Sequence, residues 1–309
     1  LGKITLLLIP FMLAGDFSVH AEEPHMNPMG PYNHPYYDEV WGAVSTDGET
    51  FDVLEGPFFR HASVPEVLEL QKSLDSLSSG TLLLYFVDFN QQPGPGEEQV
   101  SVVNSLDGKT WNAAQNIVIK NKPYEGAAVD PSVVQLEDGQ LRMYFFGPEL
   151  SGLRDPASHE GPHKIYSAVS SDSIHFTVEP GIRFEASGIT DPEVIFAQNQ
   201  WFMFLSHGQE TRLVRSKDGL QFTLDENTVF HEGGVPGAVL LHNGEVRIFL
   251  SSRGNIVSLK CNPAEPSYDS SAITLAVEKG DGLLVADPAC IYRSNGTYYL
   301  IFKYKSQQA

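Results

Sequence analysis

Short apolar runs separated by polar or glycine-bearing turns recur along the chain, and no segment has the sustained 3.6-residue periodicity of an amphipathic helix. One pattern occurs five times: a Val-Pro or Asp-Pro step, an apolar strand, a turn and a second apolar strand. The steps are Val64-Pro65, Asp130-Pro131, Asp191-Pro192, Val235-Pro236 and Asp287-Pro288. The second strands are expected over Leu82–Phe89, Leu141–Gly147, Trp201–His207, Glu245–Arg253 and Thr297–Tyr304. Because proline is tolerated at the first residue of a strand, the pattern predicts five hairpins that each begin at a proline.

A second pattern has Ser, then Asp two residues later, a small residue and a later aromatic residue. Its four copies span Ser45–Phe51, Ser105–Trp111, Ser170–Phe176 and Ser216–Phe222. An Asp side chain bonds its own backbone in such a turn, and the small residue accepts a positive φ. We interpret these segments as structural hairpin turns, since turn chemistry explains every fixed position.

Together the two patterns give a repeating unit of four strands, which is typical of β-propeller blades. The C-terminus supplies only a first and a second strand. The N-terminus, after residue 21, supplies a third strand over Val40–Ser45 and a fourth over Phe51–Phe59. These two pairs of strands together make one further blade. The resulting ring is closed and has no free sheet edges between its ends. The sequence predicts an all-β fold, a five-bladed β-propeller over residues 22–309 closed by the N-terminal strands on the C-terminal hairpin.

Residues 1–21 have the pattern of a signal peptide. Lys3 gives the positive start, Ile4–Ala14 is a short apolar run, and Val19-His20-Ala21 fits a small-residue cleavage site. The apolar run is too short to cross a bilayer, although an N-terminal core strand is the alternative. The expected location is therefore secreted or periplasmic, with no membrane span.

The formal net charge of −19 and the two cysteines narrow the possible partners. Such acidity disfavours nucleic acid, whose binding depends on basic patches, and a neutral carbohydrate fits better. Cys261 and Cys290 could pair only if their Cα atoms lie within about 7 Å. The sequence has no zinc-like ligand spacing and no glycine-rich phosphate loop.

Side chains that suit chemistry gather on one predicted face of the propeller. Strands alternate in direction within a blade, so first-strand starts, second-strand ends and links between blades share a face. The candidates from the first strands are Asp130, Asp191, Asp287, Glu66 and Glu193, those from the second strands are Asp88, His207, Arg253 and Lys303, and those from the links include His61 and His231. A long loop over Pro148–His163 opens on the same face and is either functional or a tolerated insertion.

The three Asp-Pro pairs are the strongest functional signal. One Asp before proline often caps a turn. Three in equivalent positions of a ring are different, because like charges brought close raise each other's pKa and cost stability. The set therefore indicates acid–base chemistry, contacts to sugar hydroxyls or a cation. A structural Ca²⁺ in the central channel is one possibility, and no other cofactor is expected.

These segments resemble the five-bladed glycoside hydrolases, with the greatest local similarity to glycoside hydrolase family 43. Val129–Val133 followed by Glu137–Leu141 is similar to that family's Asp-Pro-Ser strand and acidic-Gly turn, where the Asp tunes the pKa of the acid. Ala286–Ile291 followed by Gly296–Leu300 is similar to the strand whose Asp is the general base. The resemblance covers nearly the whole chain after residue 21 through short motifs.

Two departures separate this chain from the family pattern. The base-like Asp287 lies in the last blade rather than the first, although the cyclic order still matches. The family's acid is a Glu before Gly-Pro, whereas the matching stretch here is Thr190–Glu193. Either Asp191 or Glu193 takes that role, or the mechanism differs, or the site is inactive.

The resemblance implies a glycoside hydrolase that acts on a neutral or weakly charged saccharide. Asp287 is expected as the base, Glu193 or Asp191 as the acid, and Asp130 as the residue that tunes the acid's pKa. The expected substrate contacts are His61, Glu66, Asp88, His207, His231 and Arg253. A non-catalytic glycan-binding propeller and a related glycoside phosphorylase are the alternatives.

Overall fold

The computed structural model describes residues 35–90, 99–124, 128–146, 162–262, 267–268, 274–278, 280–282 and 284–306, all within one compact unit over His34–Ala309. Strands and turns make up this part of the chain, apart from the short 3-10 turn η2 (Pro35–Tyr37). The predicted signal peptide lies outside the described residues, and so does the predicted long loop except for its last two residues.

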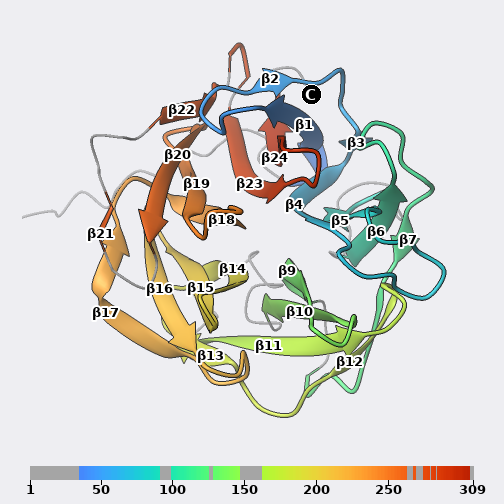
Figure 1. Ribbon diagram of the computed structural model, residues 1–309, viewed down its shortest axis with the longest axis vertical. Coiled ribbons are helices and arrows are strands. Elements are labelled where there is room, and N and C mark those ends of the chain that lie inside the picture. Colours follow the sequence, from blue (N-terminus) through green and yellow to red (C-terminus); the bar gives the residue numbers. More distant parts are fainter. Residues whose placement is uncertain are drawn as a thin grey trace, which may run out of the picture. The chain divides into compact units, whose positions relative to one another are not determined.

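Five sheets of mainly antiparallel strands are arranged as the blades of a ring, as Figure 1 shows. Blade one contains β4 (Ala62–Glu69), β5 (Leu82–Asp88), β6 (Gln99–Ser105) and β7 (Gln115–Asn116). Blade two contains β9 (Val129–Gln135), β10 (Leu141–Phe146), β11 (His163–Ser170) and β12 (His175–Val178), with β8 (Val118–Lys120) parallel to β12 and β13 (Phe184–Ala186) beside β11. Blade three contains β14 (Thr190–Ala197), β15 (Gln200–His207), β16 (Glu210–Ser216) and β17 (Thr223–Phe230).

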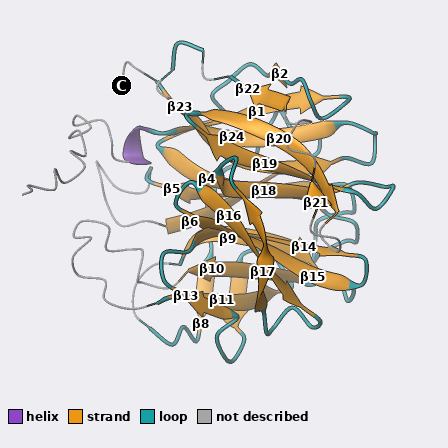
Figure 2. Cartoon of the chain, turned by 90° about the vertical axis from the view of Figure 1, so that its left-hand side faces the viewer, coloured by secondary structure: helices purple, strands orange, loops and turns teal. Residues whose placement is uncertain are grey.

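Blade four contains β18 (Gly234–Leu240), β19 (Val246–Ser252), β20 (Asn255–Asn262), β21 (Ser267–Tyr268) and β22 (Thr274–Val277). Blade five joins the two ends of the chain: β23 (Leu284–Tyr292) and β24 (Tyr298–Lys305) with β1 (Glu39–Ser45), β2 (Asp52–Val53) and β3 (Phe59–Arg60). Figure 2 shows the same strands from the side. The all-β, five-bladed propeller predicted from the sequence is confirmed.

Ring closure follows the predicted pairing. Strand β1 pairs with β24 in an antiparallel register that runs from Glu39↔Tyr304 to Ser45↔Tyr298. The predicted fourth strand over 51–59 is shorter than expected, because only Asp52–Val53 and Phe59–Arg60 at its two ends pair with β1.

Each Ser-x-Asp turn also fastens one blade to the next. In the first copy, Ser45 Oγ accepts the Gly48 N–H at 2.9 Å and Asp47 Oδ1 accepts the Glu49 N–H at 2.8 Å. The carbonyl of the small residue then accepts a hydrogen bond from the second strand of the preceding blade. The donors are Arg247 to Gly48, Tyr299 to Gly108, Tyr85 to Ser173 and Tyr144 to Gly219. The structural interpretation of these turns is therefore correct, and the turns act between blades as well as within them.

Apolar side chains fill the gaps between neighbouring blades. The hydrophobic clusters of the described residues each combine the facing sides of two adjacent blades, so every blade packs against both of its neighbours. Burial of this apolar surface is the main stabilising term for such a ring. Within the described ranges, no helix has the length and apolar character to cross a membrane.

Candidate active site

The residue before the repeated proline has the same unusual backbone conformation in all five inner strands. Each takes a positive φ: 46° at Val64, 52° at Asp130, 47° at Asp191, 46° at Val235 and 50° at Asp287. The register with the second strand shifts at each of these steps, as at a β-bulge. The strands therefore begin before the proline rather than at it, because the bulge accommodates a residue that lacks an N–H.

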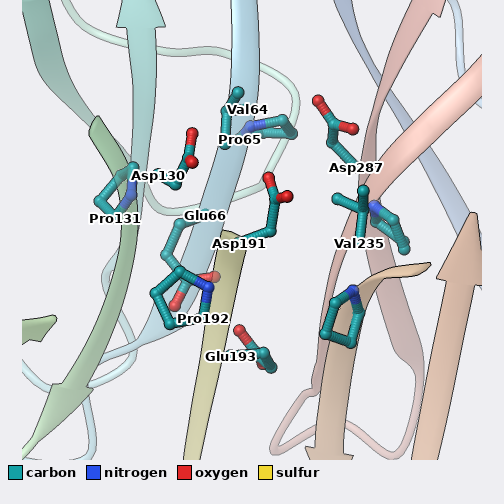
Figure 3. A pocket seen from close by; sticks show the side chains of 12 residues that line it. Val64, Pro65, Glu66, Asp130, Pro131, Asp191, Pro192, Glu193, Val235 and Asp287 are labelled. Atoms are coloured by element: carbon teal, nitrogen blue, oxygen red, sulfur yellow. The ribbon is translucent and has the colours of Figure 1, made fainter. Parts of the chain in front are cut away.

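These bulges create two rings of side chains around the channel. The pre-proline ring consists of Val64, Asp130, Asp191, Val235 and Asp287. The post-proline ring consists of Glu66, Ser132, Glu193, Gly237 and Ala289. In Figure 3 the carboxyl groups of Asp130, Asp191 and Asp287 point toward one end of the channel, whereas those of Glu66 and Glu193 lie further along in the other direction. The bulge separates side chains that a regular strand would place on one face.

Asp287 is held in the pre-proline ring by an ion pair. Its carboxyl Oδ2 lies 2.6 Å from Lys303 Nζ, and its backbone N–H donates to Ser251 Oγ at 3.1 Å. Asp287 is almost fully buried. Burial alone would lower the pKa of Lys303, but the nearby carboxylates of Asp287, Asp38 and Asp191 raise it. The ammonium group is therefore a permanent positive charge beside Asp287.

Asp191 has the opposite electrostatic setting. Burial raises the pKa of its carboxyl, and the negative charge of Asp287 raises it further, to about 6. A hydrogen bond from Thr190 and the charge of Lys303 act in the other direction. One carboxyl of the ring thus has a cation at 2.6 Å, and another is biased toward its protonated form. Such a division is typical of a base and an acid that work together.

The post-proline ring ties adjacent inner strands together. Glu66 Oε1 accepts the Val133 N–H at 2.8 Å, and Glu193 Oε1 accepts the Ala238 N–H at 3.0 Å. Ser132 Oγ accepts the Val194 N–H at 3.0 Å in the equivalent place. Each bond runs from one blade to the same position of the next, and so satisfies a buried N–H of the neighbouring inner strand.

These ties bring two carboxyl groups into the interior. Burial raises the pKa of Glu193 to about 8, against the lowering effect of its bonds from Ala238 and Ser132. Burial and the charge of Glu193 raise the pKa of Glu66 well above its usual range. Glu193 is therefore mainly protonated at neutral pH, and both carboxyl groups accept hydrogen bonds from the protein's own groups.

The channel is narrow where the two rings meet. The twelve residues shown in Figure 3 line a space of about 20 Å³, which is close to the room that one water molecule needs. A larger hollow of about 360 Å³ lies along the ends of the inner strands, beyond Glu66 and Glu193. It is lined by Phe196, Trp201, Leu240 and Tyr292 among others.

The remaining candidate residues lie outside the lining of the narrow channel. Asp88 is buried and accepts hydrogen bonds from Ser101 and Asn90. His61 stacks on Tyr36 with ring centroids 4.0 Å apart. Three exposed candidates complete the set: His207 at the end of β15, His231 within 2.7 Å of Glu210, and Arg253 in the turn after β19. Their roles as substrate contacts stay predictions.

Two site residues were missed from the sequence. Ser132 Oγ accepts a hydrogen bond from the Val194 N–H of β14. Asp38 precedes β1, and its Oδ1 lies 2.9 Å from Lys305 Nζ. Asp38 lies in no local motif, whereas the position of Ser132 in the Asp-Pro-Ser segment could have indicated its role. In the described ranges no group of three or more His, Cys, Asp or Glu side chains is arranged to hold a metal ion. Cys261 and Cys290 are separate buried thiols.

Comparison with known proteins supports the fold. No sequence family and no curated protein matches the chain. Among solved structures, a GH32 β-fructofuranosidase of Bombyx mori aligns with a TM-score of 0.60 and 14% identity over 80% of this chain and 56% of its own. A thermostable family-43 glycoside hydrolase aligns with 0.55 and 13% over 79% and 88%. A family 117 glycoside hydrolase of Zobellia galactanivorans aligns with 0.51 and 11% over 90% and 93%.

The class defined by the fold is therefore the five-bladed β-propeller found in these glycoside hydrolases. The resemblance predicted from the sequence is confirmed at the level of the fold. The chain spans about half the length of the GH32 enzyme that it matches. At identities of 11–14%, these alignments do not carry substrate or residue roles across.

Proposed function

We propose that this protein is a glycoside hydrolase that cleaves a neutral or weakly charged oligo- or polysaccharide. The observation that carries the proposal is the pair formed by Asp287 and Asp191 at one end of the channel. Asp287 has Lys303 at 2.6 Å, and Asp191 has a pKa raised to about 6. Glycoside hydrolysis needs such a pair, one carboxylate and one carboxylic acid.

In the proposed mechanism Asp287 is the ionised partner and Asp191 the general acid. Asp287 either activates a water molecule or attacks the sugar directly, and Asp191 protonates the leaving oxygen. Asp130 stands at the equivalent position of β9 and adds a third carboxyl to the ring. Glu193 is the weaker candidate for the acid, because both of its oxygens accept hydrogen bonds and it lies further along the channel.

The channel lining favours hydrolysis over phosphorolysis. No Arg or Lys is among the residues that line the narrow space between the rings, whereas phosphate binding would call for convergent cations. The nearest cation described, Lys303, is already paired with Asp287. An extracellular substrate remains a further part of the proposal and rests on the sequence of residues 1–21 alone.

The direct test is a panel of aryl glycosides and oligosaccharides assayed with the wild type and with Asp287→Asn. The substitution should reduce kcat/KM by about 10²–10⁴-fold on whichever substrate is cleaved. The anomer released first, followed by NMR, distinguishes inversion from retention. Saccharide binding without turnover by the wild type would support the glycan-binding alternative and contradict the hydrolase.

The pH profile is a second test. Because the acid must be protonated and the pKa of Asp191 in the free protein is about 6, kcat/KM should fall as pH rises above about 6. In Asp191→Asn this limb should be absent. Aryl glycosides with highly acidic leaving groups should be affected least, since they depart without a proton. An alkaline limb that persists unchanged in Asp191→Asn would assign the acid elsewhere.

A further inference from the structure

A chain of alternating charges runs from Asp287 across the seam where the two ends of the protein meet. We infer that Lys303 is a positioning residue that keeps Asp287 ionised and oriented, and that Asp38 and Lys305 brace it from the N-terminal side of the seam. This inference deepens the proposed function and rests on the assignment of Asp287 as the reactive carboxylate. It adds residues that do not contact the substrate but control the charge and orientation of Asp287, which does.

The backbone register places these side chains in line. Strand β23 pairs with β24 so that Ala286 faces Lys303, and β24 pairs with β1 so that Tyr304 faces Glu39. Asp38 directly precedes β1 and therefore lies beside Lys305. Charged side chains from β23, β24 and the segment before β1 are thus neighbours in a single row, although Asp38 and Asp287 lie at opposite ends of the sequence.

The contacts along this row are short and specific. Lys303 Nζ lies 2.6 Å from Asp287 Oδ2, and Lys305 Nζ lies 2.9 Å from Asp38 Oδ1. Ser63 Oγ donates to Asp38 Oδ2 at 2.9 Å from β4 of blade one. The Asp38 backbone is fixed as well, since its N–H donates to Pro35 and its carbonyl accepts the Ala62 N–H. Asp38 therefore has a single defined position.

The charged groups of this row are buried, so their mutual interactions are weakly screened by water. Asp38 is 1% exposed, Asp287 6% and Lys305 7%. Burial raises the pKa of Asp38, while the charges of Lys303 and Lys305 lower it. Two cations and two carboxylates offset one another, and removal of any one leaves an uncompensated buried charge. Since the charge of Asp38 also raises the pKa of Lys303, Asp38 helps to keep Lys303 protonated beside Asp287.

Asp287 meets few other charges. The groups that face it are Lys303 from β24, Asp191 from β14 and the Ser251 hydroxyl from β19, and Asp130 from β9 lines the same narrow space. Strands β4 and β18 present Val64 and Val235 at the equivalent positions, while Glu66 and Glu193 lie further along the channel. In the described part of the chain, Lys303 is the cation within ion-pair distance of this carboxylate. The state of Asp287 should therefore depend on Lys303 more than on any other side chain.

The experiment replaces Lys303 and follows the protonation of Asp287 directly. Protein with ¹³C-labelled Asp carboxyl groups is titrated by NMR, and the Asp287 signal is assigned by its loss in Asp287→Asn. Lys303→Met should move the Asp287 titration to higher pH by about one unit or more, a tenfold tighter hold on the proton. Lys303→Arg, which keeps the charge, should titrate like the wild type. The pH–activity profile should show the same displacement of its acidic limb.

Lys305→Met is the matched control. It removes one buried cation from the same strand and the same row, but it contacts Asp38 rather than Asp287. Its effect on the Asp287 titration should be smaller than that of Lys303→Met. Asp38→Asn keeps the shape of the side chain. It should lower kcat less than Lys303→Met does, with little change in KM.

The outcomes separate this inference from the proposed function. An Asp287 titration that is the same in Lys303→Met and in the wild type overturns the positioning role, whatever the activity. If the wild type cleaves no glycoside but Lys303→Met displaces the titration, the charge row stands and the hydrolase proposal fails. Should Lys303→Met not fold, Lys303→Gln and Lys303→Arg give the same contrast between a neutral and a charged side chain.

Discussion

The pre-proline and post-proline residues lie two positions apart on the same strands, yet their carboxyl groups have different roles. The carboxyl groups of Asp191 and Asp287 lie beside each other with Lys303 nearby. In the contacts described, neither accepts a hydrogen bond from the backbone of a neighbouring inner strand. Glu66 and Glu193 each hold a backbone N–H of the next blade. The difference follows the bulge: the Asp side chains before the proline point toward one end of the channel, and the Glu side chains after it lie in the other direction.

The largest expected effect is on kcat/KM, which should depend on a carboxyl of the pre-proline ring but not on one of the post-proline ring. Asp191→Asn should lower kcat/KM by about 10²–10⁴-fold on substrates with poor leaving groups, because it removes the proposed acid. Glu193→Gln is the matched change in the other ring. It should leave kcat/KM within about threefold, because it keeps an oxygen acceptor for Ala238 and lies outside the reacting pair. Steady-state kinetics on one substrate checks both, and the reverse ranking would make Glu193 the acid.

The next effect concerns stability where the post-proline ring has no side chain. A Cβ on Gly237 would lie 2.0 Å from the Pro288 carbonyl oxygen, so β18 and β23 can approach only with glycine there. Gly237→Ala should lower the free energy of unfolding by about 3 kcal/mol, measured in urea. Gly244→Ala is the control: its φ is 85° with open space around it, and the cost should be about 1 kcal/mol. Equal costs would show that the two strands can separate without penalty.

A third effect depends on pH. The folded-state pKa of Glu193 is raised from 4.5 to about 8, so the wild type holds this proton more tightly when folded. That contribution is fully present below pH 4.5 and is lost as pH rises toward 8. Glu193→Gln does not titrate and should gain about 3 kcal/mol relative to the wild type between pH 5 and pH 8. Urea unfolding at the two pH values measures the gain, and a constant difference would place the ionisation elsewhere.

The smallest effect concerns the two pre-proline positions that are not Asp. Val64 and Val235 are β-branched residues held at a φ of 46°, which strains the backbone. Asn tolerates this conformation, so Val235→Asn should stabilise the fold by about 1 kcal/mol. Val118→Asn, at an exposed strand position without a positive φ, should not stabilise. A loss of stability in Val235→Asn would mean that the packing of its methyl groups outweighs the strain.

Most of the fold could be predicted because its determinants are local. Asp47 and Gly48 define one kind of turn, the pre-proline steps mark the five inner strands, and the strands that remain near the two ends of the sequence complete one blade. The bounds of the fourth strand of blade five could not be predicted. Residues 54–58 lie between two short pairings with β1, and that division depends on packing rather than on local pattern.

The site could be predicted only to the level of a set of residues. Repetition placed Asp130, Asp191 and Asp287 in equivalent positions, which the structure reproduces. The directions of Asp191 and Glu193 could not be inferred, because two residues apart on a regular strand means the same face. The positive φ at the bulge changes that rule. Contacts such as Lys303–Asp287 and Lys305–Asp38 depend on strand register, which no short motif reveals.

The pairing of β1 with β24 has a consequence for the time course of folding. Ser45 leaves the ribosome long before its partner Tyr298 exists, by on the order of tens of seconds at ordinary rates of synthesis. Throughout that interval β1 is a strand without its eventual neighbour, and strands in that condition are prone to wrong associations. Native blade five, together with the contacts between Lys303, Asp38 and Asp287, can therefore assemble only after β24 has been synthesised. Of the five blades, the one that carries Asp287 is the last whose strands are all present.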